Sequence, residues 1–392
     1  MSLSAFEKRV KRHVTAPPRD FYAATAPGLE SLCLRELRTI LPGRPMRRLG
    51  AGIEFNARLH EAYLANLWLR TANRVLMRID TFKATRWDTF EKKAGALAWE
   101  LFLPGECPLQ FRVTARQSRL YHSDAIAARL ANSISKRLAE CAPQHSTSAT
   151  AQTVFARLLA DRLTLSLDSS GEHLHRRGVK VNVAAAPLRE TIAAAALMLA
   201  EYAPPEPLLD PMCGSGTFSI EAAMLSCRVP PGWFRDFAFT QWPAFGVNYK
   251  RWQYLKDQSG KNMLSPDRPV VFASDRDERA CGILRKNIAS YGMSPAVGIE
   301  KKDFFDLVPA GYAHRPGLVV LNPPYGRRIG SAADSDRLFR QIVLKLKKDF
   351  RGWKTALIVP RRYLLESIPF AFRPHKVAAG GLNLYITVAT VE

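Results

Sequence analysis

Short apolar runs alternate with longer amphipathic stretches along the second half of the chain. Each run ends in Asp, Asn, Pro or the chain end, which is typical of buried strands, and strands are predicted at residues 208–209, 269–275, 318–321, 354–360 and 382–392. Apolar residues at helical spacing predict helices between them, including an Ala-rich helix from about Arg189. Strands that alternate with helices form a mostly parallel, doubly wound sheet, so we expect an α/β fold here.

The first half of the chain carries smaller α and β elements. Helices are predicted at residues 58–70, 87–97 and 123–140, strands at 20–26, 74–82, 109–115 and within 153–167, and a hairpin at 46–56. Residues 2–19 are basic and end in Pro17 and Pro18, which predicts a mobile arm or a poorly packed leader. Because this half holds neither a phosphate loop nor a cluster of carboxylates, we expect it to be a binding module.

Polar residues follow the predicted strands of the second half. Asp210 opens a turn that holds Gly214 and Gly216, while Asp275 and Asn322 each follow a later strand. Glycine lets the backbone approach a ligand closely, and a helix that begins after the turn offers unpaired N–H groups to an anionic group. Ligands of doubly wound sheets bind beyond the carboxyl ends of the strands, where an acid such as Asp275 can accept hydrogen bonds from ribose. We therefore expect these residues to form one nucleotide-like site.

Charge and length change this picture by pointing to a polyanionic partner. The 392 residues suffice for two or three domains, and the net charge is +22, with the excess shared by both halves. A basic surface of this size favours nucleic acid, although many basic soluble proteins bind none. The six cysteines show neither CxxC nor CxxH spacing, which predicts reduced thiols in the cytoplasm and no metal site. We find neither a signal peptide pattern nor a long apolar run, and so expect no membrane association.

The glycine turn favours one cofactor class over others. It contains Gly214-Ser215-Gly216 and matches neither the GxGxxG of dinucleotide binders nor the GK[ST] of a P-loop. The turn, the acid-ended strand, residues 303–306 (DFFD) and residues 322–326 (NPPYG) together resemble the class I methyltransferases that use S-adenosyl-L-methionine to modify exocyclic amines of nucleobases. This resemblance implies that the turn holds the methionine part of the cofactor, Asp275 its ribose, and Asp303 beside Phe304 its adenine. The implied residues of the turn are Asp210, Pro211, Cys213, Gly214, Ser215, Gly216 and Thr217.

Asn322, Pro323, Pro324 and Tyr325 are the candidate catalytic residues. An aryl amine is a poor nucleophile because its lone pair is delocalised into the ring. The Asn322 side-chain oxygen and the Pro323 carbonyl can accept both amine hydrogens and aim the lone pair at a methyl-sulfonium. The two prolines stiffen this turn, and Tyr325 offers a ring for stacking on a flipped base. The amine proton can leave after the transfer, so the mechanism requires no general base.

The resemblance extends to nearly the whole chain. Residues 21–37, 65–79, 166–178 and 186–198 resemble the THUMP-containing guanine-N2 methyltransferases of large-subunit ribosomal RNA. This implies an N-terminal arm and ferredoxin-like segment at 1–60, a THUMP RNA-binding domain at 61–170 and a Rossmann-like methyltransferase domain at 171–392. Thr191, within residues 187–191 (PLRET), is then implied to line the methionine end of the cofactor. Val179 departs from the aromatic that the family generally carries after HxRG.

Basic residues near these segments are the candidate RNA contacts, although a single surface Lys or Arg is usually only solvated. The candidates are Arg112, Arg116, Arg119, His175, Arg176, Arg177, Arg327 and Arg328. Residues 229–269 interleave aromatic and basic side chains, which is typical of base stacking or, more often, of a packed core. We expect the aromatic side chains there to pack.

The leading interpretation is therefore an enzyme that methylates the N2 amine of a guanosine in 23S ribosomal RNA. Two alternatives within the enzyme class are guanosine-N2 methylation of transfer RNA and adenine-N6 methylation of RNA or DNA. A different class of function is a catalytically silent RNA-binding or ribosome assembly factor that keeps the fold. The intact residues Asp210, Gly214, Gly216, Asp303 and Asn322 count against that last alternative.

Overall fold

A computed structural model describes residues 3–143, 148, 150–178, 188–324 and 331–392. The chain divides into two compact units that are interleaved in sequence. Unit 1 comprises Met1–Thr25, Leu34–Leu174 and Arg235–Gln258, and unit 2 comprises Ala26–Cys33, His175–Phe234 and Ser259–Glu392. Within the described ranges, no helix is both long enough and apolar enough to cross a membrane.

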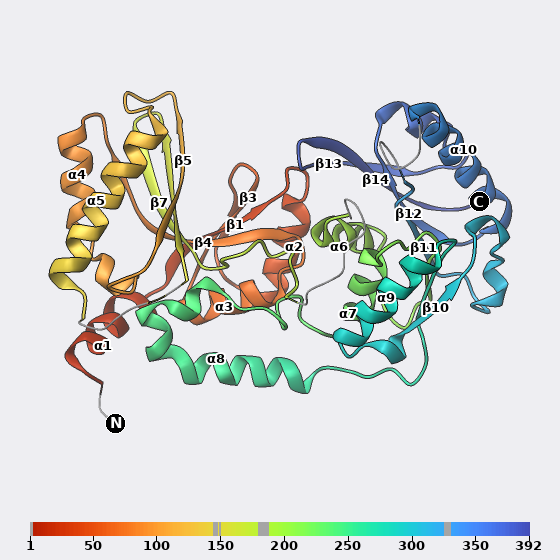
Figure 1. Cartoon of the computed structure of the whole chain (residues 1–392), viewed down its shortest axis with the longest axis horizontal. Helices are drawn as coiled ribbons and strands as arrows, with labels where there is room; N and C mark the ends of the chain where they lie inside the picture. Colours follow the sequence, from red (N-terminus) through yellow and green to blue (C-terminus); the bar gives the residue numbers. More distant parts are fainter. Residues whose placement is uncertain (1–2, 144–147, 149, 179–187, 325–330) are drawn as a thin grey trace. The chain divides into compact units, whose positions relative to one another are not determined.

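Unit 1 is built on a seven-stranded sheet with the order β2-β3-β1-β4-β7-β6-β5 (Figure 1). The strands are β1 (Arg19–Thr25), β2 (Met46–Arg48), β3 (Gly52–Ala57), β4 (Ala72–Lys83), β5 (Leu109–Arg116), β6 (Gln152–Leu159) and β7 (Arg162–Asp168). Neighbouring strands are antiparallel except for β5 and β6, which are parallel. These positions confirm the strands predicted from period-two patterns.

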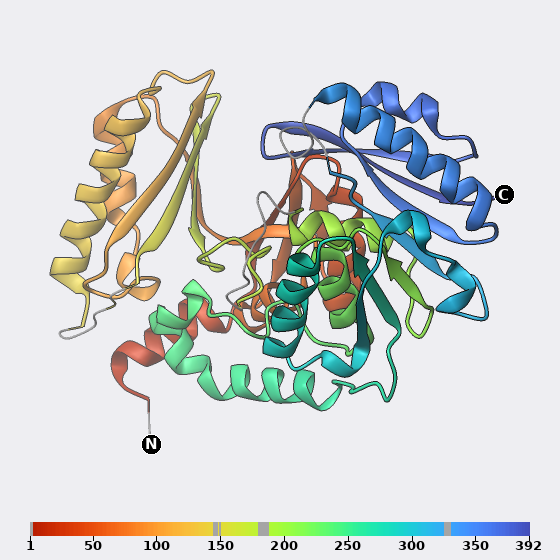
Figure 2. The ribbon, with the colours of Figure 1, turned by 45° about the vertical axis from the view of Figure 1, so that its right-hand side comes forward.

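The two faces of this sheet differ in chemistry. Register places Phe21, Met77, Leu167 and Val154 in one row across β1, β4, β7 and β6, and all four are buried. Residues one position away point to the opposite face, because side chains alternate along a strand. Helices α4 (Trp87–Ala96) and α5 (Ser123–Cys141) lie along one side of β5, β6 and β7 (Figures 1 and 2). The apolar rows therefore form the core of unit 1.

The N-terminal residues are helical, which corrects the prediction of a mobile arm or a poorly packed leader. Helix α1 (Ala5–Val10) and a π-helical segment (Lys11–Thr15) bury Val10 and Val14. Ser4 starts α1 with a capping box, in which its hydroxyl accepts from the Glu7 N–H and the Glu7 carboxylate accepts from the Ser4 N–H. Such a reciprocal pair fixes a helix start despite the basic residues that follow.

The aromatic insert is packed, as predicted, and most of its rings join unit 1. Helix α8 (Pro243–Lys261), which sequence analysis missed, carries Trp252 against the ring of Tyr63 in α3 (Leu59–Trp68). Phe239 stacks on Tyr63 with ring centroids 4.2 Å apart, and the Trp242 indole N–H donates to Gln152 Oε1 at 2.9 Å. Buried rings in these contacts cannot stack on bases, so base stacking is excluded for them.

Unit 2 holds the second seven-stranded sheet, with the order β10-β9-β8-β11-β12-β14-β13. Its strands are β8 (Leu208–Asp210), β9 (Val271–Asp275), β10 (Val297–Lys301), β11 (Leu318–Leu321), β12 (Lys354–Val359), β13 (Arg373–Ala379) and β14 (Leu382–Thr390). The pairs from β10 to β12 are parallel, and β14 pairs antiparallel with β12 and with β13. This confirms the predicted doubly wound, mostly parallel sheet, to which the structure adds β10 and β13.

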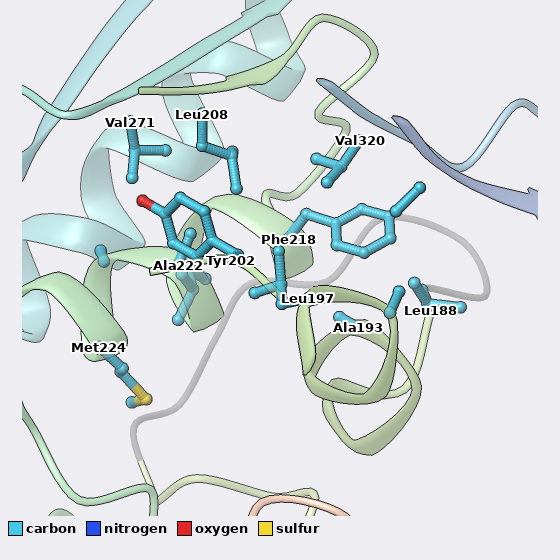
Figure 3. Close-up of a cluster of buried hydrophobic side chains, with 14 of the residues drawn as sticks. Leu188, Ala193, Leu197, Tyr202, Leu208, Phe218, Ala222, Met224, Val271 and Val320 are labelled. Atoms are coloured by element: carbon cyan, nitrogen blue, oxygen red, sulfur yellow. The ribbon is translucent and has the colours of Figure 1, made fainter. Parts of the chain in front are cut away.

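Helices cover this sheet and close its core. The helices are α6 (Glu190–Leu199), α7 (Thr217–Ser226), α9 (Glu278–Ser290) and α10 (Ala332–Asp349), while α2 (Glu30–Ile40) begins in unit 2 and ends in unit 1. Figure 3 shows Leu197 of α6 and Phe218 of α7 among side chains from β8, β9 and β11. Burial of such a continuous apolar surface provides the main stabilisation of the sheet and holds its strand ends in place.

Candidate active site

Three adjacent strands bring the predicted site residues to one edge of the unit 2 sheet. The order β9-β8-β11 is parallel throughout, with Asp210 paired to Ala273 and Leu209 paired to Val319. Asp275 ends β9, Asp210 ends β8, and Asn322 follows the last residue of β11. The carboxyl ends of all three strands therefore meet at the same edge, as predicted.

The turn after β8 has a fixed backbone conformation. Its Cys213 N–H donates to the Ser274 carbonyl of β9 at 3.0 Å, and the Gly216 N–H donates to the Cys213 carbonyl at 2.8 Å. Gly216 has φ of +87°, and a Cβ there would lie 2.1 Å from Leu284 Cδ1 of α9. A side chain at Gly216 would therefore be both strained and crowded. Gly214, with φ of +55°, has open space where a Cβ would stand, so this part of the turn can face a ligand.

Asp210 braces the turn from inside the core. It is 1 % exposed, and its carboxylate accepts from the Ser219 hydroxyl at 2.6 Å and from the Ser219 N–H at 3.2 Å. Burial raises the pKa of Asp210 to about 7, against the two hydrogen bonds from Ser219, which lower it. Ser219 lies in the first turn of α7, so Asp210 ties the helix N-terminus to the end of β8.

We expect Asp210→Asn to remove a pH-dependent loss of stability. Because the folded-state pKa of about 7 exceeds the unfolded value, the folded chain keeps a proton that the unfolded chain loses between about pH 4 and pH 7. The contribution of Asp210 to the free energy of unfolding therefore falls as pH rises through this window and is constant above it. Urea unfolding at several pH values gives the free energy of unfolding of both proteins. Between about pH 4 and pH 7, the value for the wild type should fall relative to the value for the variant. An equal pH dependence in both proteins would contradict it.

Asp275 reaches from β9 to the same turn. One carboxylate oxygen accepts from the Gly214 N–H at 3.0 Å and the other from the Asp277 N–H at 3.0 Å. A carboxylate oxygen accepts at two lone pairs, so each oxygen keeps one position for a further donor such as a ribose hydroxyl. The Asn287 side-chain amide of α9 donates to the Ser215 carbonyl at 3.4 Å and supports the turn from the other side.

Asp303 and Phe304 differ in whether their side chains are accessible to a ligand. The Asp303 carboxylate accepts from the Phe305 N–H at 2.8 Å and remains half-buried, so it is accessible to a ligand. Phe304 is 1 % exposed and stacks on Phe350 in the core, with ring centroids 6.0 Å apart. Its ring packs as a core side chain, so a cofactor contact of Phe304 would have to come from its backbone.

Asn322 carries the clearest unsatisfied polar group of the site. Its side-chain oxygen Oδ1 is buried and has no hydrogen-bond partner among the described residues. A buried acceptor without a donor costs about 1–3 kcal/mol, and such groups in native structures call for a specific explanation. Pro323 is the next residue and is buried, and its ring restricts the backbone that carries the Pro323 carbonyl. Among the described residues, the Asn322 oxygen is therefore an acceptor of the site that has no donor.

The predicted cofactor contact Thr191 and the predicted RNA contacts at residues 175–177 differ in how far they are buried. Thr191 is 1 % exposed in the first turn of α6. His175 is half-buried and Arg176 is exposed, whereas Arg177 is buried and its Nε donates to Glu221 Oε1 of α7 at 2.8 Å. A guanidinium held in this way faces the core rather than RNA, so Arg177 is dropped from the proposed RNA contacts.

The other candidate RNA contacts fall in unit 1 or outside the description. Arg112 and Arg116 are exposed on β5, and Arg119 follows β5 with its Nε 3.9 Å from an Asp161 carboxylate oxygen. Tyr325, Arg327 and Arg328 lie outside the described residues.

Sequence reasoning missed three residues that shape the site: Ser219, Asn287 and Glu221. Ser219 was detectable, because a Ser in the first turn of a helix that follows an acid-ended strand can bond that acid. Asn287 and Glu221 act on residues 72 and 44 positions away, respectively, and only the tertiary structure reveals such pairs.

Comparisons with known proteins agree with this geometry. The family described as UPF0020, RMKL-like, methyltransferase domain, matches residues 177–377, and the RlmL ferredoxin-like domain matches residues 20–76. The chain is 34 % identical to the ribosomal RNA large subunit methyltransferase K/L of Methylococcus capsulatus over 93 % of its own length and 50 % of that relative. It thus spans about half the length of several of the curated relatives it matches.

Two further relatives match along nearly their full length. One is the Synechocystis protein slr0064, whose name gives it as an unproven RNA methyltransferase. The chain is 31 % identical to it, with 90 % of this chain and 92 % of that protein covered. The other is the solved structure of SMU.472 in complex with SAH, at 25 % identity and a TM-score of 0.84, with 96 % and 99 % of the two chains covered.

Proposed function

Because the chain belongs to the family of RMKL-like methyltransferases, we propose that it transfers a methyl group from S-adenosyl-L-methionine to the N2 amine of a guanosine in 23S ribosomal RNA. Family membership confirms the predicted family, the Rossmann-like methyltransferase domain and the class of enzyme. The observation that carries the proposed chemistry is the Asn322 oxygen, which is buried and has no hydrogen-bond partner in the described part of the chain, at the edge that also holds the glycine turn. Relatives named as large-subunit ribosomal RNA methyltransferases support the choice of RNA.

The residues of the turn fit the cofactor. Open space at Gly214 leaves room for the cofactor beside the backbone, and the N-terminus of α7 favours its carboxylate. We assign the free lone pairs of Asp275 to the ribose hydroxyls, the Asp303 carboxylate to the adenine amine, and Thr191 to the methionine end. When bound, the cofactor supplies an electrophilic methyl group on a sulfonium.

The acceptor pair orients the amine of the substrate. The Asn322 oxygen and the Pro323 carbonyl each accept one amine hydrogen, which fixes the nitrogen and its lone pair toward the methyl donor. The Asn322 oxygen has no hydrogen-bond donor among the described residues, and in this proposal the amine of the substrate supplies one. Tyr325, named from the sequence alone, is assigned to stacking on the base, and solvent takes the proton after the transfer.

Two broader assignments accompany this proposal. Ribosomal RNA and the six free cysteines favour action in the cytoplasm. The binding of RNA is assigned chiefly to unit 1, because the turn, Asp275 and Asn322 of unit 2 are committed to the methyl transfer.

The test is transfer of labelled methyl to deproteinised ribosomal RNA, followed by digestion to nucleosides and mass spectrometry. We expect label in N2-methylguanosine from large-subunit RNA. Label in N6-methyladenosine, or label only with transfer RNA, would replace the proposed substrate by one of the alternatives. An absence of label with every RNA, for protein that binds the cofactor, would favour a catalytically silent assembly factor.

A further inference from the structure

Two adjoining hollows lie along the unit 1 sheet, and the smaller one reaches the first turns of α5 at Ser123, Asp124 and Ala127. One has a volume of about 810 Å³ and the other about 480 Å³, and both are lined by Arg78, Arg157 and Thr164. The larger hollow adds Arg19, Arg47 and Arg162, and the smaller one adds Arg112. The shared lining residues make the two hollows parts of one concave surface, which we call the arginine face.

Strand register explains why these side chains gather. Arg112, Phe155, Ser166 and Arg78 form one row across β5, β6, β7 and β4. The next row is formed by Thr114, Arg157, Thr164 and Thr81. On β6 and β7 these residues alternate with the buried Val154, Ala156, Leu165 and Leu167, so their side chains lie on the opposite face of these strands from the core.

All six cationic side chains that line the arginine face are arginines, and none is a lysine. A guanidinium offers a planar fork of donors that matches a phosphate, whereas an ammonium is a point charge. The lining also holds the acids Asp20, Glu54, Asp80 and Asp124, but Glu54 is paired with Arg47 and Arg78. Arg112, Arg157 and Arg162 are exposed and form no ion pair with another described residue. Six arginines against four acids leave the lining with an excess of two positive charges.

Arg78 is held in place for such a ligand. Its guanidinium lies over the Tyr22 ring, 4.6 Å from the centroid, and donates to the Ser166 hydroxyl at 2.9 Å. The Nε of Arg78 lies 3.6 Å from Glu54 Oε2, and the Nε of Arg19 is buried and lacks a hydrogen-bond partner in the described part of the chain. Burial lowers the pKa of both arginines; at Arg78 the charge of Glu54 opposes this lowering and the charge of Arg157 adds to it. An anion in the hollow would therefore stabilise both side chains.

We propose that the arginine face binds a single-stranded segment of the RNA substrate, with phosphates on the arginines and bases along Phe155 and Leu159. Half-buried Phe155 and exposed Leu159 lie beside Arg157 on this face. Basic grooves with aromatic side chains are typical of single-strand binding, and a concave surface of this size fits splayed nucleotides better than a rigid duplex. This inference deepens the proposed function and rests on it only for the identity of the RNA.

The test removes the three unpaired arginines from the full chain. Arg112→Gln, Arg157→Gln and Arg162→Gln are combined in one variant. The matched control combines Arg38→Gln, Lys92→Gln and Lys136→Gln, which are exposed positions on α2, α4 and α5. Both variants lose three charges, so a general electrostatic effect would weaken them equally. Fluorescence anisotropy with a labelled single-stranded RNA of mixed sequence, and with its duplex, gives affinity and salt dependence.

We expect the arginine variant to bind the single strand about tenfold or more weakly, with the salt slope reduced by about 2, because about 0.7 is lost for each single-strand phosphate contact. The control keeps its affinity, and both variants keep the affinity for SAH and the wild-type melting temperature. Equal weakening of both variants, an unchanged arginine variant, or equal competition by polyglutamate would overturn the proposal. The single variant Arg157→Gln repeats the test should the triple variant fold poorly.

This result is separable from the proposed function, because binding is measured without methyl transfer. Loss of the arginine-face effect in a protein that still methylates guanosine would contradict only the docking surface. Normal binding through this face in a wild-type protein that transfers nothing would contradict only the proposed function.

Discussion

Replacing Asn322 by Ala is expected to lower the rate of methyl transfer by about 10²–10³-fold while leaving the affinity for the cofactor nearly unchanged. The substitution removes the acceptor that fixes one amine hydrogen, so the lone pair is no longer aimed at the methyl donor. None of the cofactor contacts assigned above involves this side chain. Transfer of tritiated methyl to ribosomal RNA gives the rate, and calorimetry with SAH gives the affinity.

Two variants control this result. Asn322→Asp keeps an acceptor oxygen and should retain more activity than the alanine variant. Asn383→Ala removes an exposed amide from β14 of the same unit and should leave transfer unchanged. Transfer at the wild-type rate by Asn322→Ala would show that another group orients the amine.

The second large effect concerns the buried ion pair between Arg177 and Glu221. Both side chains are buried, with exposures of 1 % and 0 %, and Arg177 Nε lies 2.8 Å from Glu221 Oε1. Truncation of either partner removes the opposite charge that the other buried side chain faces at 2.8 Å, and breaking a buried pair in this way costs about 3–5 kcal/mol. We therefore expect Arg177→Ala to lower the free energy of unfolding by this amount, as measured by urea unfolding monitored by circular dichroism.

An exposed pair of the same unit provides the control. Arg285 and Glu278 are 45 % and 55 % exposed, so Arg285→Ala should change the stability by less than about 1 kcal/mol. The double variant Arg177→Ala, Glu221→Ala should be less destabilised than the sum of the single variants, because it removes both charges of the pair together. A change below 1 kcal/mol for Arg177→Ala would mean that the pair is a solvated contact, and Arg177 would again be a candidate for RNA.

Sequence patterns located the edge of the sheet because local signals specify it. An apolar run followed by Asp210, Asp275 or Asn322 marks the end of a buried strand, and parallel strands bring such ends together. The family assignment and the fold class are confirmed. The division at residues 60 and 170, the name THUMP for the middle segment and the roles of the site residues stay predictions.

Sequence patterns did not predict contacts between residues that are far apart in the sequence. The basic loop that holds Arg177 has the composition of a surface, and only its partner on α7 buries it. The rings of the aromatic insert were expected to pack, but a sequence pattern does not identify Tyr63 of unit 1 as their partner. The N-terminal helix, in contrast, carried a local signal in the capping box of Ser4 and Glu7, which the basic composition obscured.

The most direct test of the account is a crystal structure with S-adenosyl-L-methionine bound, in which the distance from Asn322 Oδ1 to the methyl carbon is measured. An amine that is held by Asn322 and is close enough to react requires a distance of about 6 Å or less, with the oxygen still free of protein donors. A methyl carbon more than about 10 Å away, or a cofactor bound anywhere but beside the glycine turn, would contradict the proposed chemistry.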